Sequence, residues 1–214
     1  MNKGVVITLP RWDNVTEYLS HFSNQIIEEA DSVGVKCKTL DGKDANKINF
    51  EKVIKNLDYS FVVFNGHGSP ESIKGHKDET LIEVGKNEEL LKGRIVYARA
   101  CEAAVVLGKL CVEDNNGCFI GYNFPFVFWA DKTWDSVPQK DETARLFLEP
   151  SNMVPISLIR GHNAKESNRK SKLHILKNIK KEIKKNDKDT PMIVEGLLNN
   201  YYGQVLLGNG DARL

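Results

Sequence analysis

The chain lacks the features of a membrane protein and of a general polyanion binder. No apolar run approaches the ~18 residues of a membrane span, and the apolar part of residues 1–10 is too short for a signal peptide. Lys and Arg number 30 and Asp and Glu 29, for a formal net charge of +1. This balance argues against nucleic acid as a partner of the molecule as a whole. We expect a cytoplasmic protein with no membrane association.

The chain also lacks the cysteine and histidine spacings of a disulfide framework or a metal site. Its four cysteines form no CxxC pair and lie in apolar runs, which suits a reducing compartment: Cys37, Cys101, Cys111 and Cys118. No HExxH-type pairing occurs, and the glycine-rich stretch 66–70 lacks the Gly-Lys-Ser/Thr of a P-loop. We therefore expect no metal and no cofactor.

What the sequence does contain is a regular alternation of strand-like and helix-like segments. Its 214 residues, 41% hydrophobic and 28% charged, fit a single globular domain over 1–214. The pattern predicts strands over 4–9, 35–40, around Phe61, around Ile95, and over 118–122 and 204–207. It predicts helices over 13–33, 46–57, directly after Cys101, and over 141–148, 164–185 and 191–202. We expect an α/β fold, a three-layer sandwich with a mostly parallel sheet and helices on both faces.

Two of the predicted strands end in chemically useful side chains. The run Phe61–Phe64 leads into Asn65-Gly66-His67-Gly68, and the run beginning at Ile95 leads into Ala100-Cys101. The carboxyl ends of adjacent parallel strands are where α/β folds bind ligands. A His and a Cys at that edge indicate a nucleophile and its proton-transfer partner.

The predicted chemistry is thiol-based acyl transfer. Cys101 begins the next predicted helix, whose free amides and dipole favour a thiolate. The amides of Gly68 and Cys101 converge on a developing oxyanion, and His67 protonates the leaving amine and then activates water. Taken singly, Cys101 is as well explained as a buried apolar residue and His67 as part of an ordinary loop. Their matched contexts favour catalysis.

These motifs resemble the peptidase group that holds caspases, legumains, clostripain, separases and gingipains. Residues 65–69 and 98–104 resemble most the gingipain-like and CHAT-domain branch, and 117–122 and 205–214 are similar to its later strand and closing segment. The resemblance implies a caspase-like fold with His67 and Cys101 as the dyad. The caspase signature Gln-Ala-Cys-x-Gly is absent, because Arg99 replaces Gln and Ala103 replaces Gly. This departure counts against cleavage after aspartate.

Relatives in this group read chiefly the residue before the cleaved bond, and many select Arg or Lys with an acidic pocket. The candidates are Glu102, Asp131 and Asp135, with Trp129 and Trp134 as walls. Each acid is equally explained as a solvated surface residue, and the aromatic run as core packing. The resemblance further implies a protein or peptide substrate, a regulatory protein partner, and a role in bacterial defence or regulated cell death.

The remaining prominent feature is the basic segment 165–188, with ten Lys or Arg against three acids. It indicates either a docking face for nucleic acid or an acidic protein, or the solvated face of an amphipathic helix packed on the sheet; we favour the helix. Two other functions stay open: a scaffold or binding module with an unused dyad, and a Cys-His acyl transferase or thioesterase.

Overall fold

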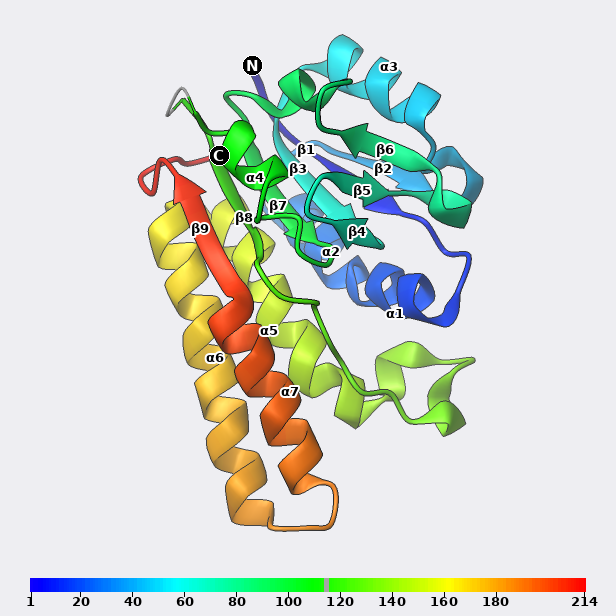
Figure 1. Cartoon of the computed structure of the whole chain (residues 1–214), viewed down its shortest axis with the longest axis vertical. Helices are drawn as coiled ribbons and strands as arrows, with labels where there is room; N and C mark the ends of the chain where they lie inside the picture. The colour runs from blue at the N-terminus through cyan, green and yellow to red at the C-terminus, as the bar shows by residue number, and fades with distance from the viewer. Residues whose placement is uncertain (114–115) are drawn as a thin grey trace.

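The fold is seen in a computed structural model that describes residues 1–113 and 116–214. The strands are β1 (Asn2–Leu9), β2 (Cys37–Asp41), β3 (Tyr59–Asn65), β4 (Gly68–Ser69), β5 (Ser72–Lys74), β6 (Thr80–Glu83), β7 (Ile95–Arg99), β8 (Cys118–Tyr122) and β9 (Gln204–Gly208) (Figure 1). The α-helices are α1 (Asn14–Phe22), α2 (Asn24–Ser32), α3 (Lys47–Leu57), α4 (Leu107–Leu110), α5 (Glu142–Ile159), α6 (Ala164–Lys185) and α7 (Thr190–Gly203). Short 3₁₀ turns lie between them.

The central sheet has six strands in the order β2-β1-β3-β7-β8-β9. Every pair is parallel except β8 and β9, which are antiparallel. The chain leaves β1 for β2 on one side and returns to β3 on the other, so the strand order reverses at β1. In open α/β sheets, such a reversal marks the edge where ligands bind.

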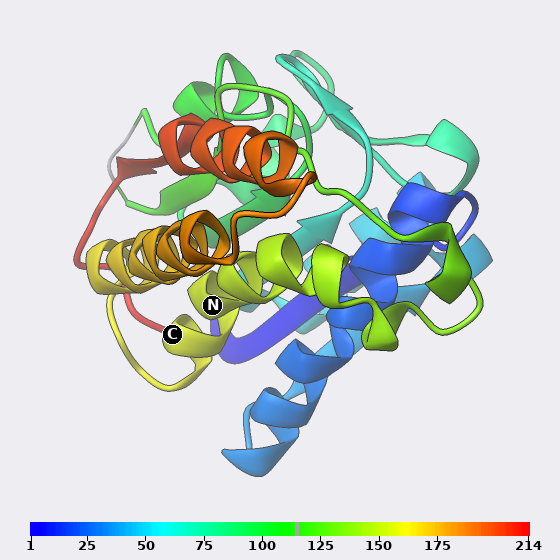
Figure 2. The same ribbon diagram turned by 90° about the horizontal axis from the view of Figure 1, so that it is seen from below.

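Helices cover both faces of this sheet because its inner strands are apolar on both sides. Val6, Val62 and Val96 face one core, together with α3, α4 and the small β4-β5-β6 sheet. Val5 and Val63, one residue away in each strand, face the other core, which α2, α5 and the start of α6 complete. The structure is thus an α/β three-layer sandwich, and the predicted fold class is confirmed (Figure 2).

Three predicted helices differ from the observed ones. The helix predicted over 13–33 divides at Ser23, whose hydroxyl donates to Leu19 O at 2.8 Å. The helix predicted over 141–148 extends to Ile159, through two prolines. Pro150 removes the hydrogen bond to Leu146 O, but Asn178 of α6 donates to that carbonyl at 2.8 Å. Packing against α6 therefore offsets the local cost of the proline. The third case, after Cys101, belongs to the site described below.

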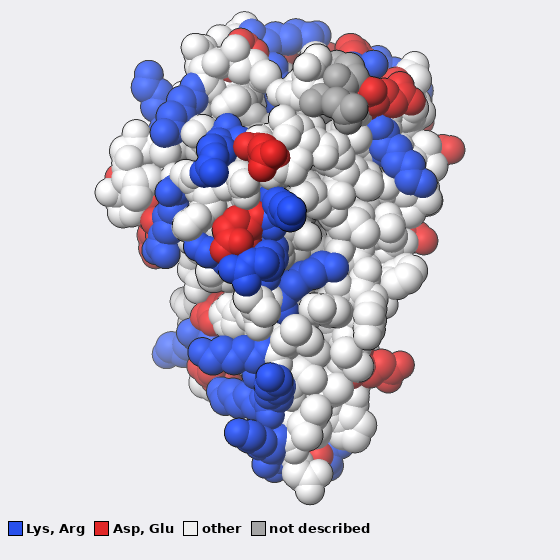
Figure 3. All heavy atoms as spheres, turned by 90° about the vertical axis from the view of Figure 1, so that its left-hand side faces the viewer, with Lys and Arg blue, Asp and Glu red and all other residues white. Residues whose placement is uncertain are grey.

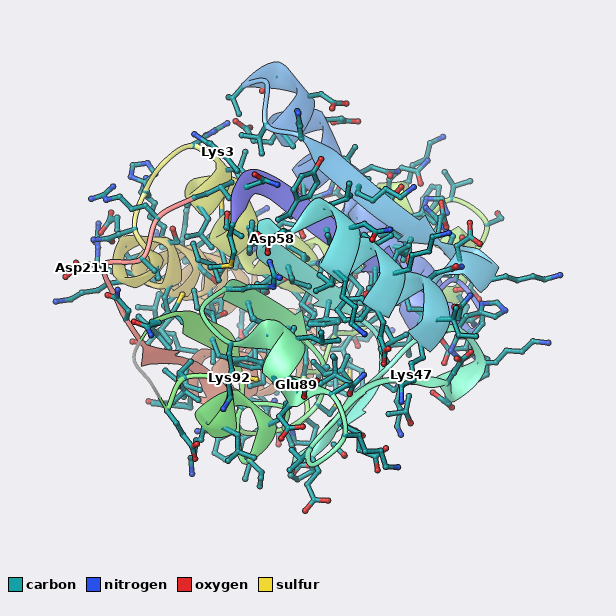
Figure 4. The ribbon with its side chains drawn as sticks, turned by 90° about the horizontal axis from the view of Figure 1, so that it is seen from above. Lys3, Lys47, Asp58, Glu89, Lys92 and Asp211 are labelled. Carbon is teal, nitrogen blue, oxygen red and sulfur yellow. The ribbon has the colours of Figure 1, made fainter. Side chains whose placement is uncertain are left out.

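The edge of the sheet opposite the carboxyl ends is closed by ion pairs. Asp58, which precedes β3, accepts from Arg94 Nη2 at 3.0 Å and lies 3.4 Å from the chain's amino group. Figure 4 looks onto this edge, where Lys3, Asp58 and Lys92 are labelled. Its contacts join strand beginnings to one another, so this edge stabilises the sheet.

Among the described residues, no helix combines the length and the apolar character needed to cross a membrane.

Candidate active site

The candidate site lies at the carboxyl ends of three adjacent parallel strands, β1, β3 and β7. Asn65, the last residue of β3, pairs in register with Arg99, the last residue of β7. His67 and Cys101 each follow two residues after that pair. The common register therefore brings both residues to one edge of the sheet, as predicted from the two motifs.

His67 is oriented by two residues of the loop that follows β1. Its Nε2 hydrogen-bonds to Asp13 Oδ2 at 2.6 Å, and the Trp12 ring lies edge-on to the imidazole with centroids 6.1 Å apart. When Nε2 carries the proton donated to Asp13, Nδ1 is left as the base. Asp13 thus fixes which nitrogen is available for proton transfer.

Asp13 is also the N-cap of α1. Its Oδ1 accepts from the Thr16 amide at 2.8 Å and the Thr16 hydroxyl at 2.6 Å, while Oδ2 faces His67. Burial raises the pKa of Asp13, but hydrogen bonds from Thr16 and His67 outweigh it and lower the pKa from its ordinary value. Asp13 was not predicted as a site residue from the sequence. The Asp-x-x-Thr capping pattern was visible, but nothing local links it to a histidine 54 residues away.

The glycines on either side of His67 have separate structural reasons. Gly66 has φ +150°, and a Cβ there would lie 2.5 Å from Lys74 O of the small sheet. A Cβ on Gly68 would lie 2.8 Å from Ala100 Cβ and 3.0 Å from Cys101 O. The backbone carrying His67 therefore lies directly against the backbone carrying Cys101, and only glycine permits that approach.

The segment after Cys101 is not the predicted helix. Residues 101–106 form turns, and α4 begins only at Leu107 and spans four residues. Glu102 adopts φ +57°, and its amide donates to Phe124 O at 3.4 Å, while the Ala104 amide donates to Tyr122 O at 3.2 Å. These amides bond to the last residue of β8 and to the chain that follows it, and they are not free. The expected stabilisation of a thiolate by a helix N-terminus was therefore wrong.

The thiol of Cys101 is half-buried, and its pKa is raised above the ordinary value. Burial raises its pKa, the Phe126 amide hydrogen-bonds to the sulfur and opposes that rise, and the charge of Glu102 adds to it. Burial also raises the pKa of Cys37 to about 11 and those of Cys111 and Cys118 to about 12. The position of Cys101, beside the His67 segment at the sheet edge, is what sets it apart from the other three.

Beneath the site lies a fully buried guanidinium. Arg99 Nε and Nη2 donate to Asn65 Oδ1 at 2.8 and 2.5 Å. The other N–H groups donate to neutral oxygens at 2.6–3.2 Å: Ser151 Oγ, Asn152 Oδ1, Leu19 O and Ser23 Oγ. In the described part of the chain, no carboxylate pairs with this charge. Burial lowers the pKa of Arg99, and Tyr97 and Tyr122 oppose that shift. In the sequence, Arg99 is visible only as a departure from the caspase signature, and no role for it was predicted.

A cavity of about 380 Å³ lies between α1 and the aromatic segment after β8. Both ribbon views show this segment beside α1 (Figures 1 and 2). The cavity wall is mainly aromatic and apolar: Val15, Tyr18, Phe126, Val127, Phe128 and Trp129. Its lining includes Asn14, which follows Asp13, and Phe126, whose amide contacts the Cys101 sulfur. The cavity thus adjoins Asp13, which contacts His67, and Phe126, which contacts Cys101.

The predicted specificity residues do not gather at one place. Asp135 and Trp129 line the cavity, together with Lys132, whose ammonium opposes the charge of Asp135. Asp131 instead caps a 3₁₀ turn: its carboxylate accepts from the Thr133 amide at 2.9 Å, which lowers the pKa of Asp131. Glu102 lies beside Cys101 and outside the cavity lining. Trp134 also lies outside that lining.

Within residues 1–113 and 116–214, no group of three His, Cys, Asp or Glu side chains has a geometry that could hold a metal ion. Comparison with known proteins gives no match, either to a family model or to a curated protein.

Proposed function

We propose that the chain is a cysteine endopeptidase with Cys101 as nucleophile and His67 as general acid and base. The observation that carries the proposal is the registered pairing of Asn65 with Arg99, which brings His67 and Cys101 to one sheet edge, with β3 next to the strand-order reversal at β1. The Asp13 contact to His67 Nε2 at 2.6 Å supports it, because a base needs a fixed tautomer. On its motifs, we place the chain in the caspase-like group, in the gingipain-like and CHAT-domain branch.

In this mechanism, His67 Nδ1 removes the thiol proton as the Cys101 sulfur bonds to the scissile carbonyl carbon. The amides of Gly68 and Cys101 stabilise the oxyanion. His67 then gives its proton to the leaving amine, which breaks the peptide bond and leaves a thioester on Cys101. Water, deprotonated by His67, releases the acyl group and restores the thiol. Because burial raises the pKa of Cys101, the proposed reaction begins from the thiol and includes the transfer of its proton to His67.

We propose that the cavity beside Trp129 receives the side chain before the cleaved bond and that Asp135 gives a preference for Arg or Lys. The exposed Asp135 carboxylate can bind a guanidinium by charge, and the aromatic rings of the cavity can stack on it. Asp135→Asn is expected to reduce cleavage after Arg and Lys about tenfold, and Lys132→Ala to increase it. Asp131→Asn, in the neighbouring turn, is the matched control. Equal cleavage by Asp135→Asn and wild type would contradict this assignment.

Covalent labelling tests the nucleophile directly. A peptidyl acyloxymethyl ketone is expected to modify Cys101 in wild type and not in His67→Ala, while iodoacetamide modifies Cys101 in both. Because burial raises the thiol pKa, the iodoacetamide rate should continue to rise above about pH 8.5, the ordinary value for cysteine. Peptidyl labelling that is equal in wild type and His67→Ala would contradict the dyad.

A binding module with an unused dyad is the second candidate. The observation that favours it is the environment of Cys101, which combines a raised pKa with no helix N-terminus. Absence of peptidyl labelling in wild type, together with retained folding, would support that alternative. For either function, we propose a cytoplasmic protein, since its four cysteines are free thiols. We also propose a regulatory protein partner, as the resemblance to the caspase-like group implies.

A further inference from the structure

Helix α6 presents a charged face that the candidate site does not use. Its inner residues, including Ser171, Ile175 and Ile179, pack against α5, α7 and the sheet. The opposite face is exposed, and in the space-filling view a band of Lys and Arg runs over it (Figure 3). The predicted amphipathic helix over 164–185 is confirmed in its bounds. What remains to be explained is its exposed face.

This face carries a groove of about 450 Å³ between two ridges of side chains. One ridge is Leu173, Lys177 and Lys181, and the other is Leu176, Lys180 and Lys184, each spaced by four residues. At about 1.5 Å per residue, the groove extends over roughly 16 Å, or three helical turns. Leu173, 48% exposed, and Leu176 lie at its amino-terminal end, and four lysines form the rest of its walls.

Among residues 1–113 and 116–214, the groove lysines have no acidic side chain within ion-pair distance. The ion pairs of α6 join Arg169 to Glu166, and Lys185 to Glu182 and Asp187. No ion pair in the described part of the chain involves the four lysines of the groove. Acids of α5 line a separate cleft next to Lys177 and Lys181, but Lys180 and Lys184 do not line it. The positive charge is therefore strongest along the ridge that carries Lys180 and Lys184.

We propose that this groove binds an acidic amphipathic helix of a partner protein. Ridges spaced by four residues accept the matching ridge of another helix. The occupant that fits places one apolar side chain against Leu173 and Leu176, and Asp or Glu on the next two or three turns between the lysines. A nucleic acid strand offers no apolar group to pack against Leu173 and Leu176. A flat bilayer surface does not fill the groove between the two ridges. The inference is independent of the peptidase proposal.

The test uses a fluorescein-labelled helical peptide of about 16 residues, with one Leu followed by Glu at successive four-residue steps. Anisotropy with the full chain should show binding that weakens about tenfold when the salt concentration rises from about 0.05 to about 0.5 M. Lys180→Glu combined with Lys184→Glu should weaken binding at least about tenfold, and Leu173→Ser about threefold. The control, Lys36→Glu combined with Lys52→Glu, reverses two exposed lysines elsewhere and should stay within about twofold.

Circular dichroism verifies that each variant is folded, and mass spectrometry verifies that the peptide stays intact. Four results would overturn the proposal: no binding at about 100 μM chain, equal binding of a scrambled peptide, equal loss in the control variant, or tighter lysine-dependent binding of single-stranded DNA or phosphatidylserine vesicles. Because the experiment measures only peptide binding, its result does not depend on whether His67 and Cys101 are catalytically active. Failure here and failure of the peptidase proposal are therefore separate results.

Discussion

Asp13 uses its two carboxylate oxygens for two different tasks. Oδ1 caps α1 through Thr16, and Oδ2 holds His67 at 2.6 Å. The side chain that caps α1 thereby also holds the histidine that follows β3. Because the cap orders the carboxylate before any substrate binds, the imidazole is oriented in the resting protein.

At the residue scale, Asp13→Asn separates these tasks. The amide oxygen keeps the cap, but the amide N–H₂ faces His67 Nε2 and moves the imidazole proton to Nδ1, where the base is needed. We expect turnover to fall by about a hundredfold or more, with the free energy of unfolding near neutral pH changed by less than about 1 kcal/mol. The measurements are kcat/KM on a cleaved peptide and urea unfolding.

The pH dependence gives an additional check on Asp13. Its lowered pKa means that the folded state favours the carboxylate, so this stabilisation is present above the ordinary Asp pKa of about 4 and is lost as the pH falls through the lowered value. The stability difference between wild type and Asp13→Asn should therefore shrink in acid. Unchanged turnover in Asp13→Asn would contradict the orienting role.

At the scale of elements, the junction between β3 and the small β4-β5-β6 sheet sets the position of His67. Gly66 turns the chain at φ +150° with Lys74 O directly opposite. The hydrogen bond from the Lys74 amide to His67 O, at 2.9 Å, fastens the far side of the turn. The small sheet thus serves as a support for the histidine.

Gly66→Ala is expected to lower the unfolding free energy by more than backbone strain alone would. Gly34, with φ +70° and no atom within 4 Å of a built Cβ, is the matched control. We expect Gly34→Ala to cost about 1 kcal/mol of unfolding free energy with activity retained. Gly66→Ala should cost about 2–4 kcal/mol, because the carbonyl must move as well, and should abolish turnover. Equal effects of the two substitutions would show that Lys74 does not constrain the turn.

The elements also show how far sequence reasoning reaches. Continuous apolar strands such as Phe61–Phe64 and the long helix α6 were predictable, because local periodicity determines them. The prediction of a helix directly after Cys101 was wrong, because the amides of Glu102 and Ala104 bond to the end of β8 and the chain that follows it. That His67 and Cys101 lie at one sheet edge was predictable, because each follows the end of one of two adjacent parallel strands; their action as a dyad stays a prediction. Asp13 was not predictable, because its contact with His67 depends on how β1 and β3 come together in space.

At the scale of the whole molecule, Arg99 connects both halves of the chain. Its guanidinium joins β3, the α1–α2 junction and α5 through six hydrogen bonds to neutral oxygens. Such a charge is tolerated only while its donors are satisfied. Both helices that follow the β1 loop are thereby tied to the strand that carries Cys101.

Arg99→Lys tests this connection. Lysine keeps the charge but offers three donors in place of five, so that buried oxygens lose their partners. We expect a loss of about 2–4 kcal/mol in unfolding free energy, whereas Arg169→Lys, at an exposed ion pair, should change it by less than about 0.5 kcal/mol. Guanidinium unfolding curves of the two variants provide the comparison. Similar small changes in both would mean that Arg99 is not a structural connector.

The central claim is that Cys101 and His67 form one catalytic unit. The most direct test is turnover of a mixed fluorogenic peptide library by the purified chain, beside Cys101→Ala and His67→Ala. We expect wild type to cleave the library, with Arg or Lys favoured before the cut, and neither variant to cleave it. Cleavage that persists in Cys101→Ala, or that persists undiminished in His67→Ala, would contradict the claim.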